Sequence, residues 1–340
     1  MEHKIKPRLG ISLGDFNGIG PEVILKTLAD HRILNFCTPI IYGNIQLLNK
    51  VKKQLALENF HLQVISETVG SDAKKVNVIN CWEEDLELTV GKPTTESGQS
   101  ALKSLQRAAE DLKNGKIDGI VTAPIDKDNI QSENFQFPGH TEFLTHYFEA
   151  PNSLMFLVGG DLRVATVTGH VPLKDVPGKL TTELLIQKLT ILLESLKHDF
   201  HIQKPKIAVL GLNPHAGENG LLGNEEGEII APAIQQMKEK GNLIFGPFPA
   251  DGFFGTASYK HFDAVLSMYH DQGLIPFKTL AFENGVNFTA GLPVVRTSPD
   301  HGTAYNIAGQ NVAQESSFRE ALLLAVDIIR KRRFNANPRN

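Results

Sequence analysis

The sequence predicts an α/β protein with a largely parallel sheet, and three observations lead to this prediction. Short apolar runs alternate with longer amphipathic segments along all 340 residues, which is the pattern of strands connected by helices. Most of the apolar runs are continuous rather than alternating, as expected of strands covered on both faces. Because the chain shows no repeat, low-complexity segment or long linker, we expect two domains that share one sheet.

The expected strands are the apolar runs bounded by turn-forming residues. The last of them is long and contains a Gly-Leu-Pro sequence, and we expect it to form one strand. In chain order the expected strands are 8–13, 38–43, 76–82, 118–124, 153–159, 163–168, 206–212, 242–248, 264–269 and 286–297.

The expected helices are amphipathic segments with start or stop signals. Pro21 is a favourable first helical residue, and Asn114-Gly115 is a C-terminal stop. Ser317 and Glu320 have the spacing of a capping box, and the basic run 330–333 complements the negative end of the last helix. In chain order the expected helices are 20–30, 99–114, 181–197, 226–240 and 317–333.

Composition excludes several classes of protein. The net charge is −4, which argues against nucleic acid as the main partner because duplex binding needs a basic surplus. The two cysteines, Cys37 and Cys81, are too few for a disulfide framework and favour a reducing compartment. No apolar run is long enough for a secretory signal or a membrane span. We therefore expect a cytoplasmic protein that has no membrane partner.

Two sequence patterns near the N-terminus suggest chemistry that their context does not support. The G-x-S-x-G pattern at 10–14 would make Ser12 a nucleophile, but Ser12 lies inside the first expected strand instead of at a strand-to-helix turn. The glycines Gly14, Gly18 and Gly20 have the order G-x-x-x-G-x-G, which reverses the Rossmann spacing. A tight loop entering a helix is the simpler interpretation.

Three histidines stand within three residues after the end of an apolar run, namely His170, His215 and His270. In open parallel sheets, ligands bind beyond the carboxyl ends of the strands, so these imidazoles could meet at one point. Three imidazoles with an open fourth position are typical of a catalytic zinc site. The alternative is three separate loop histidines, each satisfied by hydrogen bonds, and the pattern alone leaves both interpretations open.

Other polar residues occupy similar junctions. His140 and Thr141 stand at an expected helix start, where free N–H groups favour anions. Lys278, Asn287 and Arg296 follow the run that ends at His270, and a Lys and an Arg near one crevice favour a phosphate or carboxylate ligand. Solvation at the surface is the alternative for each of them.

Taken together, these segments resemble the 4-hydroxythreonine-4-phosphate dehydrogenase family of vitamin B6 biosynthesis. They span residues 14–309 in the expected order. One departure is visible, because Phe16-Asn17 replace the usual Pro-Ala of the first loop, at residues to which we assign no chemistry. The matching stretches are GDFNGIGPE, TAPIDK, PGHTEFL, TGHVPL, LNPHAGENG, YHDQGLIPFK and GLPVVRTSPDHGTAYNIAG.

The resemblance implies an isocitrate/isopropylmalate dehydrogenase-like fold, with two α/β domains sharing a largely parallel sheet and the active-site cleft between them. We expect residues 1–130 with 290–340 to form the first domain, on the cofactor side. Residues 131–289 would form the second, which carries the metal, the substrate and the dimer interface. The resemblance also implies a homodimer with active sites at the subunit interface.

The resemblance assigns roles to individual residues. The histidines His170, His215 and His270 would bind a divalent metal shared between subunits, with zinc expected and magnesium or cobalt as alternatives. The segment 298–309 would bind the adenosine part of NAD, or of NADP. The resemblance does not assign the proton acceptor; Asp271, which is next to His270, or Lys278 could take the hydroxyl proton, and Asp271 could alternatively orient a histidine. The substrate-binding residues would be His140, Thr141, Asp251, Lys278, Asn287 and Arg296, and the cofactor-binding residues His301, Gly302, Thr303, Ala304 and Asn306.

The implied reaction is the oxidation of 4-phosphooxy-L-threonine at its C3 hydroxyl by NAD. The 2-amino-3-oxo-4-phosphooxybutanoate formed would decarboxylate to 3-amino-2-oxopropyl phosphate. A metal at the C3 oxygen would stabilise the negative charge that both steps build. The alternatives are a dehydrogenase of threonate or erythronate 4-phosphate, a metal-dependent hydrolase with three histidines, and a binding or acyltransferase-like protein without metal.

Overall fold

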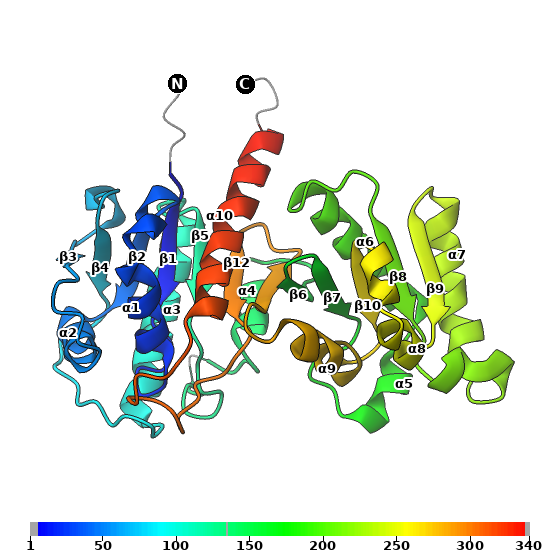
Figure 1. Ribbon diagram of the computed structural model, residues 1–340, viewed down its shortest axis with the longest axis horizontal. Coiled ribbons are helices and arrows are strands. Elements are labelled where there is room, and N and C mark those ends of the chain that lie inside the picture. The colour runs from blue at the N-terminus through cyan, green and yellow to red at the C-terminus, as the bar shows by residue number, and fades with distance from the viewer. Residues whose placement is uncertain (1–5, 134, 337–340) are drawn as a thin grey trace. The chain divides into compact units, whose positions relative to one another are not determined.

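The computed structural model describes residues 6–133 and 135–336 and divides into two compact units. Among the described residues, unit 1 comprises 6–133, 135–151 and 292–330, and unit 2 comprises 152–291 and 331–336. Both units combine a sheet with helices, as Figure 1 shows. The functional domain division expected from the sequence, with boundaries after 130 and 289, stays a prediction.

The sheet of unit 1 is parallel throughout its described pairs. Its strand order is β3-β4-β2-β1-β5-β12. The central strand β1 is buried except at its first residue, which explains why its sequence is a continuous apolar run. The strands are β1 (Arg8–Ser12), β2 (Thr38–Gly43), β3 (Leu62–Val64), β4 (Val76–Asn80), β5 (Gly119–Thr122) and β12 (Arg296–Pro299).

The helices of unit 1 begin where the local sequence provides a start signal. In α3, the Thr94 side chain accepts from the Ser97 N–H and the Ser97 hydroxyl accepts from the Thr94 N–H, a capping box. This box starts the helix four residues before the predicted position 99. The helices are α1 (Gly20–Ala29), α2 (Ile45–Gln54), α3 (Thr95–Lys113), α4 (His140–Tyr147) and α10 (Ser316–Ala336), with short 3-10 turns η1 (His31–Asn35) and η2 (Thr68–Gly70).

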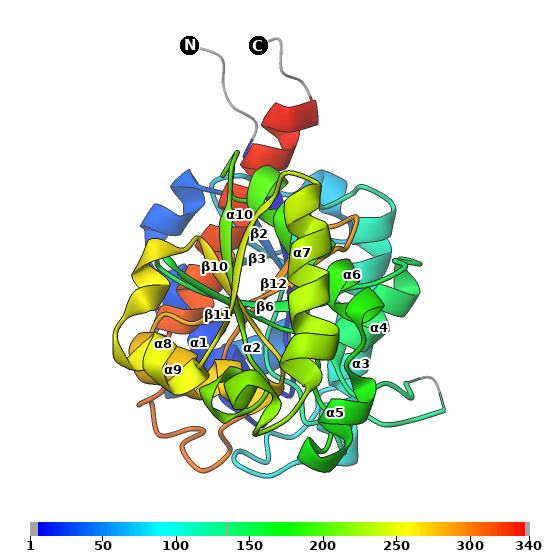
Figure 2. The same cartoon turned by 90° about the vertical axis from the view of Figure 1, so that its right-hand side faces the viewer.

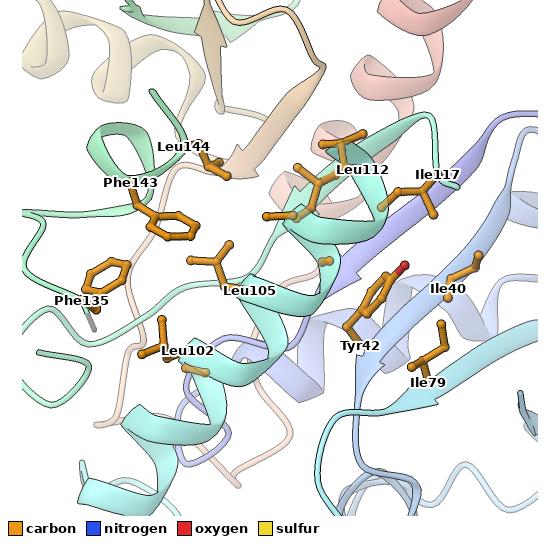
Figure 3. Close-up of a cluster of buried hydrophobic side chains, with 14 of the residues drawn as sticks. Ile40, Tyr42, Ile79, Leu102, Leu105, Leu112, Ile117, Phe135, Phe143 and Leu144 are labelled. Atoms are coloured by element: carbon orange, nitrogen blue, oxygen red, sulfur yellow. The ribbon is translucent and has the colours of Figure 1, made fainter. Parts of the chain in front are cut away.

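A hydrophobic cluster between helix and sheet forms a large part of the core of unit 1. Leu105 of α3 lies at its centre and is fully buried. Figure 3 shows the Leu105 side chain facing Phe143 of α4. Tyr42 and Ile40 of β2 lie on the other side of α3 in this view and belong to the same cluster. The predicted apolar face of 99–114 is therefore confirmed.

The sheet of unit 2 has the order β11-β6-β7-β10-β8-β9. β6 is antiparallel to both β11 and β7, whereas the β7–β10, β10–β8 and β8–β9 pairs are parallel. The three parallel pairs therefore direct the carboxyl ends of their strands to one edge. The strands are β6 (Leu154–Gly159), β7 (Leu162–Thr166), β8 (Lys206–Leu210), β9 (Leu243–Phe248), β10 (Ala264–Ser267) and β11 (Val286–Ala290).

Helices cover both faces of this second sheet. Figure 2 shows α6 and α7 on one side of the unit 2 strands and α8 and α9 on the other. Phe277 of α9 packs with Val164 and Val265 in a buried cluster. The helical elements are η3 (Leu173–Asp175), α5 (Val176–Lys179), α6 (Thr182–His198), η4 (Pro214–Gly220), the π-helix η5 (Glu226–Ile230), α7 (Ala231–Glu239), α8 (Ala250–Gly255), η6 (Ser258–His261) and α9 (His270–Ala281).

Two predictions about local structure are wrong. The run 286–297 forms two strands instead of one, because Gly291 turns the chain with φ 86° and Pro293 has no N–H to continue a ladder. Ser317 is not a helix cap, because α10 already begins at Ser316, and the Ser317 hydroxyl accepts instead from the Asp300 N–H. Within the described ranges, none of the helices is both long and apolar enough to cross a membrane.

Replacing Leu105 with Ala should lower the free energy of unfolding by about 2–5 kcal/mol, because a buried leucine leaves a cavity when truncated. Urea unfolding followed by circular dichroism measures the change. The control is Lys103→Ala, an exposed position on the same helix. Equal stability of the two variants would show that this cluster does not support the fold.

Candidate active site

Two of the three predicted metal ligands lie close together in unit 2. His170 follows β7 and His270 is the first residue of α9, directly after β10. Because β7 and β10 are parallel neighbours, the loops that follow them leave the same edge of the sheet. The ring centroids of His170 and His270 are 5.6 Å apart. Two imidazoles bound to one tetrahedral zinc ion stand about 5 Å apart, so this pair fits a common ion.

Asp271 contacts the second of these rings. The Nδ1 atom of His270 lies 2.7 Å from Oδ1 of Asp271, and an N–H there donates to the carboxylate. The contact leaves Nε2 as the ring nitrogen with a lone pair, which is the arrangement of a histidine that binds a metal through Nε2. The carboxylate is 70% exposed, so this orienting bond is open to solvent.

His215 lies on the loop after β8 and is exposed. Its backbone is left-handed, with φ 52° and ψ 27°. Within residues 6–133 and 135–336, no group of three His, Cys, Asp or Glu side chains is arranged to hold a metal ion. Within a single chain, His170 and His270 therefore form a pair, and His215 does not join them in a three-ligand group.

A buried arginine forms the centre of a second group, in unit 1. Arg296 is 3% exposed on β12. Its Nε and Nη2 atoms donate to the Thr122 hydroxyl at 3.1 and 2.7 Å, and Nη1 lies 3.5 Å from the Thr141 hydroxyl. Burial lowers the pKa of Arg296 to about 10, partly offset by Glu142. The guanidinium therefore stays charged at neutral pH and can bind a phosphate or carboxylate.

His140 belongs to the same group as Arg296 and begins α4. Burial, together with the positive charges of Arg296 and Lys127, holds the pKa of His140 well below 6.5. Its Nε2 atom is enclosed and has no hydrogen-bond partner among the described residues. A neutral imidazole with an unused nitrogen therefore lies next to a charged guanidinium, which suits a ligand that carries both an anion and a hydroxyl.

Three further predicted residues belong to unit 2. Lys278 is half-buried in the last turn of α9, and Asp251 is exposed at the start of α8. Asn287 lies on β11, and its buried Oδ1 atom has no hydrogen-bond partner among the described residues. The Asn287 oxygen is thus available to a ligand.

The predicted cofactor segment packs on the first loop of unit 1. The Thr303 carbonyl accepts from the Ile19 N–H at 2.9 Å. A Cβ atom at Gly18 would lie 2.6 Å from the same carbonyl, so only glycine fits there. Ala304 has φ 46°, while Gly302 and Asn306 are exposed. The segment is therefore fixed at Thr303 and open to solvent on either side of it.

The structure also reveals an organising residue that sequence reasoning missed. Asn17 is fully buried, and its Oδ1 accepts from the Thr89 N–H while its carbonyl accepts from the Gly91 N–H. Its own N–H donates to the buried Asp15 carboxylate, which also accepts from the Ser97 hydroxyl at 2.7 Å. Asn17 therefore anchors the 89–91 segment on the loop that packs against Thr303. The available signal was the departure of Phe16-Asn17 from the Pro-Ala that the family resemblance leads one to expect in this loop.

Comparisons with known proteins show the family to which the chain belongs. A family model described as pyridoxal phosphate biosynthetic protein PdxA matches residues 35–325. The chain is 52% identical over 333 residues to the 4-hydroxythreonine-4-phosphate dehydrogenase of Bacteroides thetaiotaomicron, covering 97% of this chain and 90% of that protein. A crystal structure of 4-hydroxythreonine-4-phosphate dehydrogenase from Klebsiella pneumoniae is 34% identical, with a TM-score of 0.81 and coverage of 96% of this chain and 99% of that chain.

A more distant structure is informative for the fold alone. A β-decarboxylating dehydrogenase from Thermococcus kodakarensis is 14% identical, with a TM-score of 0.50 over 97% of this chain and 89% of that chain. The predicted isocitrate/isopropylmalate dehydrogenase-like fold class is confirmed. The fold and these similarities define an enzyme, an oxidoreductase of the α/β dehydrogenase class. The chain belongs to the PdxA family of pyridoxal phosphate biosynthetic proteins, as its motifs predict.

His140 should make the protein less stable in acid. Because its pKa is lower in the folded protein than the unfolded value of 6.5, the unfolded chain binds a proton that the folded chain does not. The free energy of unfolding is therefore unaffected by protonation of this histidine above pH 6.5. As pH falls below 6.5, the free energy of unfolding decreases by at most about 1.4 kcal/mol per pH unit.

The measurement is the urea midpoint of wild type and His140→Asn at several pH values between 7 and 5. We expect the variant to lose less stability over this range than wild type. The control is His61→Asn, at an exposed histidine. Parallel curves for wild type and His140→Asn would contradict the assignment.

Proposed function

We propose that the chain is an NAD-dependent and divalent-metal-dependent 4-hydroxythreonine-4-phosphate dehydrogenase. It would oxidise 4-phosphooxy-L-threonine at the C3 hydroxyl to 2-amino-3-oxo-4-phosphooxybutanoate, which decarboxylates to 3-amino-2-oxopropyl phosphate. The observation that carries this proposal is the 5.6 Å pair of imidazoles, His170 and His270, in a chain of the PdxA family. The cytoplasmic location expected from the sequence is part of the same proposal.

The metal site is the first part of the proposed mechanism. His170, His215 and His270 would hold the ion, with zinc favoured by a ligand set of three imidazoles. When bound, the ion would supply a Lewis acid for the hydroxyl oxygen, and NAD or NADP an acceptor for hydride. The bond from His270 to Asp271 favours an orienting role for that carboxylate. Lys278, in its neutral amine form, is then the proposed acceptor of the hydroxyl proton.

Substrate anchoring is the second part. The charged Arg296, with Thr141 at 3.5 Å, would bind an anionic group of the substrate. His140 would accept a hydrogen bond at its unused Nε2 atom. Asn287 would contribute its buried Oδ1 atom, and Asp251 an exposed carboxylate to the substrate amino group. Binding groups of this kind hold a substrate in one orientation, which is their main contribution to a hydride transfer.

The cofactor would contact the segment from His301 to Asn306. The hydrogen bond between Ile19 and Thr303 holds the middle of this segment, and its exposed glycine and asparagine leave backbone groups open to the adenosine. The neighbouring residues His301, Gly302 and Ala304 complete the proposed contact surface. This arrangement supports NAD binding without the Rossmann glycine pattern, which the sequence lacks.

A homodimer would complete the metal site. Exposed apolar side chains follow each of the three histidines within a few residues, namely Leu173 at 68%, Leu221 at 79% and Ile275 at 64% exposure. Large exposed apolar side chains are candidates for burial at a protein interface. We propose that these residues contact a second copy of the chain, and that His215 of one copy serves the His170 and His270 pair of the other.

The reaction is tested by NADH absorbance with purified protein and 4-phosphooxy-L-threonine. We expect NADH formation that a chelator abolishes and Zn²⁺ or Co²⁺ restores, because the histidines act only through the ion. Threonate and erythronate 4-phosphate are the control substrates, since they lack the amino group. Faster turnover of either control would favour the sugar-acid alternative, and chelator-resistant turnover would contradict the metal site.

Replacing Ile275 with Glu should separate the proposed dimer, because a charge would be buried at the interface. Sedimentation velocity should show a dimer for wild type and a monomer for the variant, with loss of NADH formation. Val69→Glu is the matched control, at an 81% exposed apolar residue of unit 1. An Ile275→Glu protein that is dimeric and active would refute this interface.

A further inference from the structure

The turn that carries His215 has an unusual backbone. Five successive residues have left-handed conformations, with φ 52° at His215, 51° at Ala216, 82° at Gly217, 45° at Glu218 and 55° at Asn219. Only one of the five is glycine. Residues with a side chain rarely adopt this conformation, and a run of them persists only where the surrounding structure enforces it. Contacts from outside the turn must therefore hold it.

The carboxylate of Glu226 lies beneath the turn. Glu226 is 5% exposed at the start of the π-helix η5. Its Oε1 atom accepts from the N–H groups of Leu212 and Asn213, each at 2.7 Å, and its Oε2 atom accepts from the Asn213 side-chain amide at 3.0 Å. Hydrogen bonds to an ionised acceptor are stronger than those between neutral groups. The carboxylate thus fixes the backbone two residues before His215.

Glycines allow the chain to approach this carboxylate closely. A Cβ atom at Gly217 would lie 2.6 Å from Oε2 of Glu226, and one at Gly211 would lie 3.0 Å from Oε1. The turn therefore wraps around Glu226 on both sides of His215. Glu225 adds a bond from the same Asn213 amide at 2.7 Å, which fixes the orientation of that amide.

We propose that Glu226 is a positioning residue for the metal site, holding the left-handed turn in the conformation that presents the His215 imidazole to the ion. The inference rests on the proposed function, because it takes His215 as a ligand. Glu226 itself touches neither the ion nor the substrate in this role. Residues that orient metal ligands typically contribute 10–100-fold to metal affinity.

Glu226→Gln is the most informative change. The Gln oxygen can still accept from the two backbone N–H groups. Its NH₂ group would face the NH₂ group of Asn213, and because both groups are donors the hydrogen bond between them would be lost. The Asn213 amide cannot turn over without losing its bond to Glu225. We therefore expect the substitution to loosen the turn while keeping the size of the side chain. Glu228→Gln, an exposed position in the same π-helix, is the matched control.

The experiment is a Co²⁺ titration of the metal-free full-length protein, followed by visible absorbance against a competing chelator. We expect Glu226→Gln to raise the Co²⁺ dissociation constant 10–100-fold and Glu228→Gln to change it less than twofold. Thermal unfolding of the metal-free proteins checks that each is folded. A positioning role further predicts that kcat of Glu226→Gln recovers at saturating Co²⁺ while KM for the phosphorylated substrate is unchanged, a rescue that a general loss of structure would not show.

The outcomes separate this inference from the proposed function. If His215→Ala binds Co²⁺ as tightly as wild type, the proposed metal site itself is wrong. If His215→Ala loses affinity and folded Glu226→Gln does not, the positioning role alone is refuted.

If Glu226→Gln does not fold, Asn213→Ala takes its place, because it removes the amide between the carboxylates and leaves the two backbone bonds. We expect Asn213→Ala to weaken Co²⁺ binding several-fold. Wild-type affinity for that variant would overturn the inference.

Discussion

The parallel pairing of β7 with β10 is the constraint on which the candidate metal site depends. Val265 pairs with Val164 and Ser267 with Thr166, so the two strands end at the same level of the sheet. The loops that follow them must then leave side by side, and His170 and His270 come within 5.6 Å although 100 residues separate them in sequence. Met268 adds to this, because its carbonyl accepts from the Thr168 hydroxyl just past both strand ends. A shift in register would separate the rings.

The two units supply different chemistry. Unit 2 supplies imidazoles in a half-open setting, where neutral nitrogen ligands suit a divalent ion. Unit 1 supplies a guanidinium that burial keeps in place and an imidazole that burial keeps neutral, which suits recognition of an anion beside a hydroxyl. Burial lowers the pKa of both side chains, but the outcome at neutral pH differs. Arg296 stays charged in spite of its burial, and His140 stays neutral because of it. The sequence around Arg296 and His140 does not indicate this difference in protonation.

Much of the fold follows from the sequence because apolar runs and caps are local signals. The expected strand 8–13 and helix 181–197 agree with β1 and α6 to within one residue at each end, because apolar runs and amphipathic patterns are local signals. The sequence does not predict the short strand Leu62–Val64, because none of its three residues is buried and its central residue Gln63 is polar. The convergence of His170 and His270 was predictable from strand ends, but the left-handed turn at His215 was not. Its conformation depends on Glu226, eleven residues further along the chain, and no local pattern specifies such a contact.

The division of the chain also bears on how the protein is made. Unit 1 draws its last strand and most of its last helix from residues 292–330, whereas all six strands of unit 2 lie between 152 and 291. Since domains fold as units while the chain is synthesised from its N-terminus, the unit 2 sheet can form on the ribosome before β12 has been translated. The sheet of unit 1 is incomplete until β12 emerges, because one edge of β5 is unpaired before then. Truncation near the C-terminus would therefore harm the earliest-made half of the polypeptide.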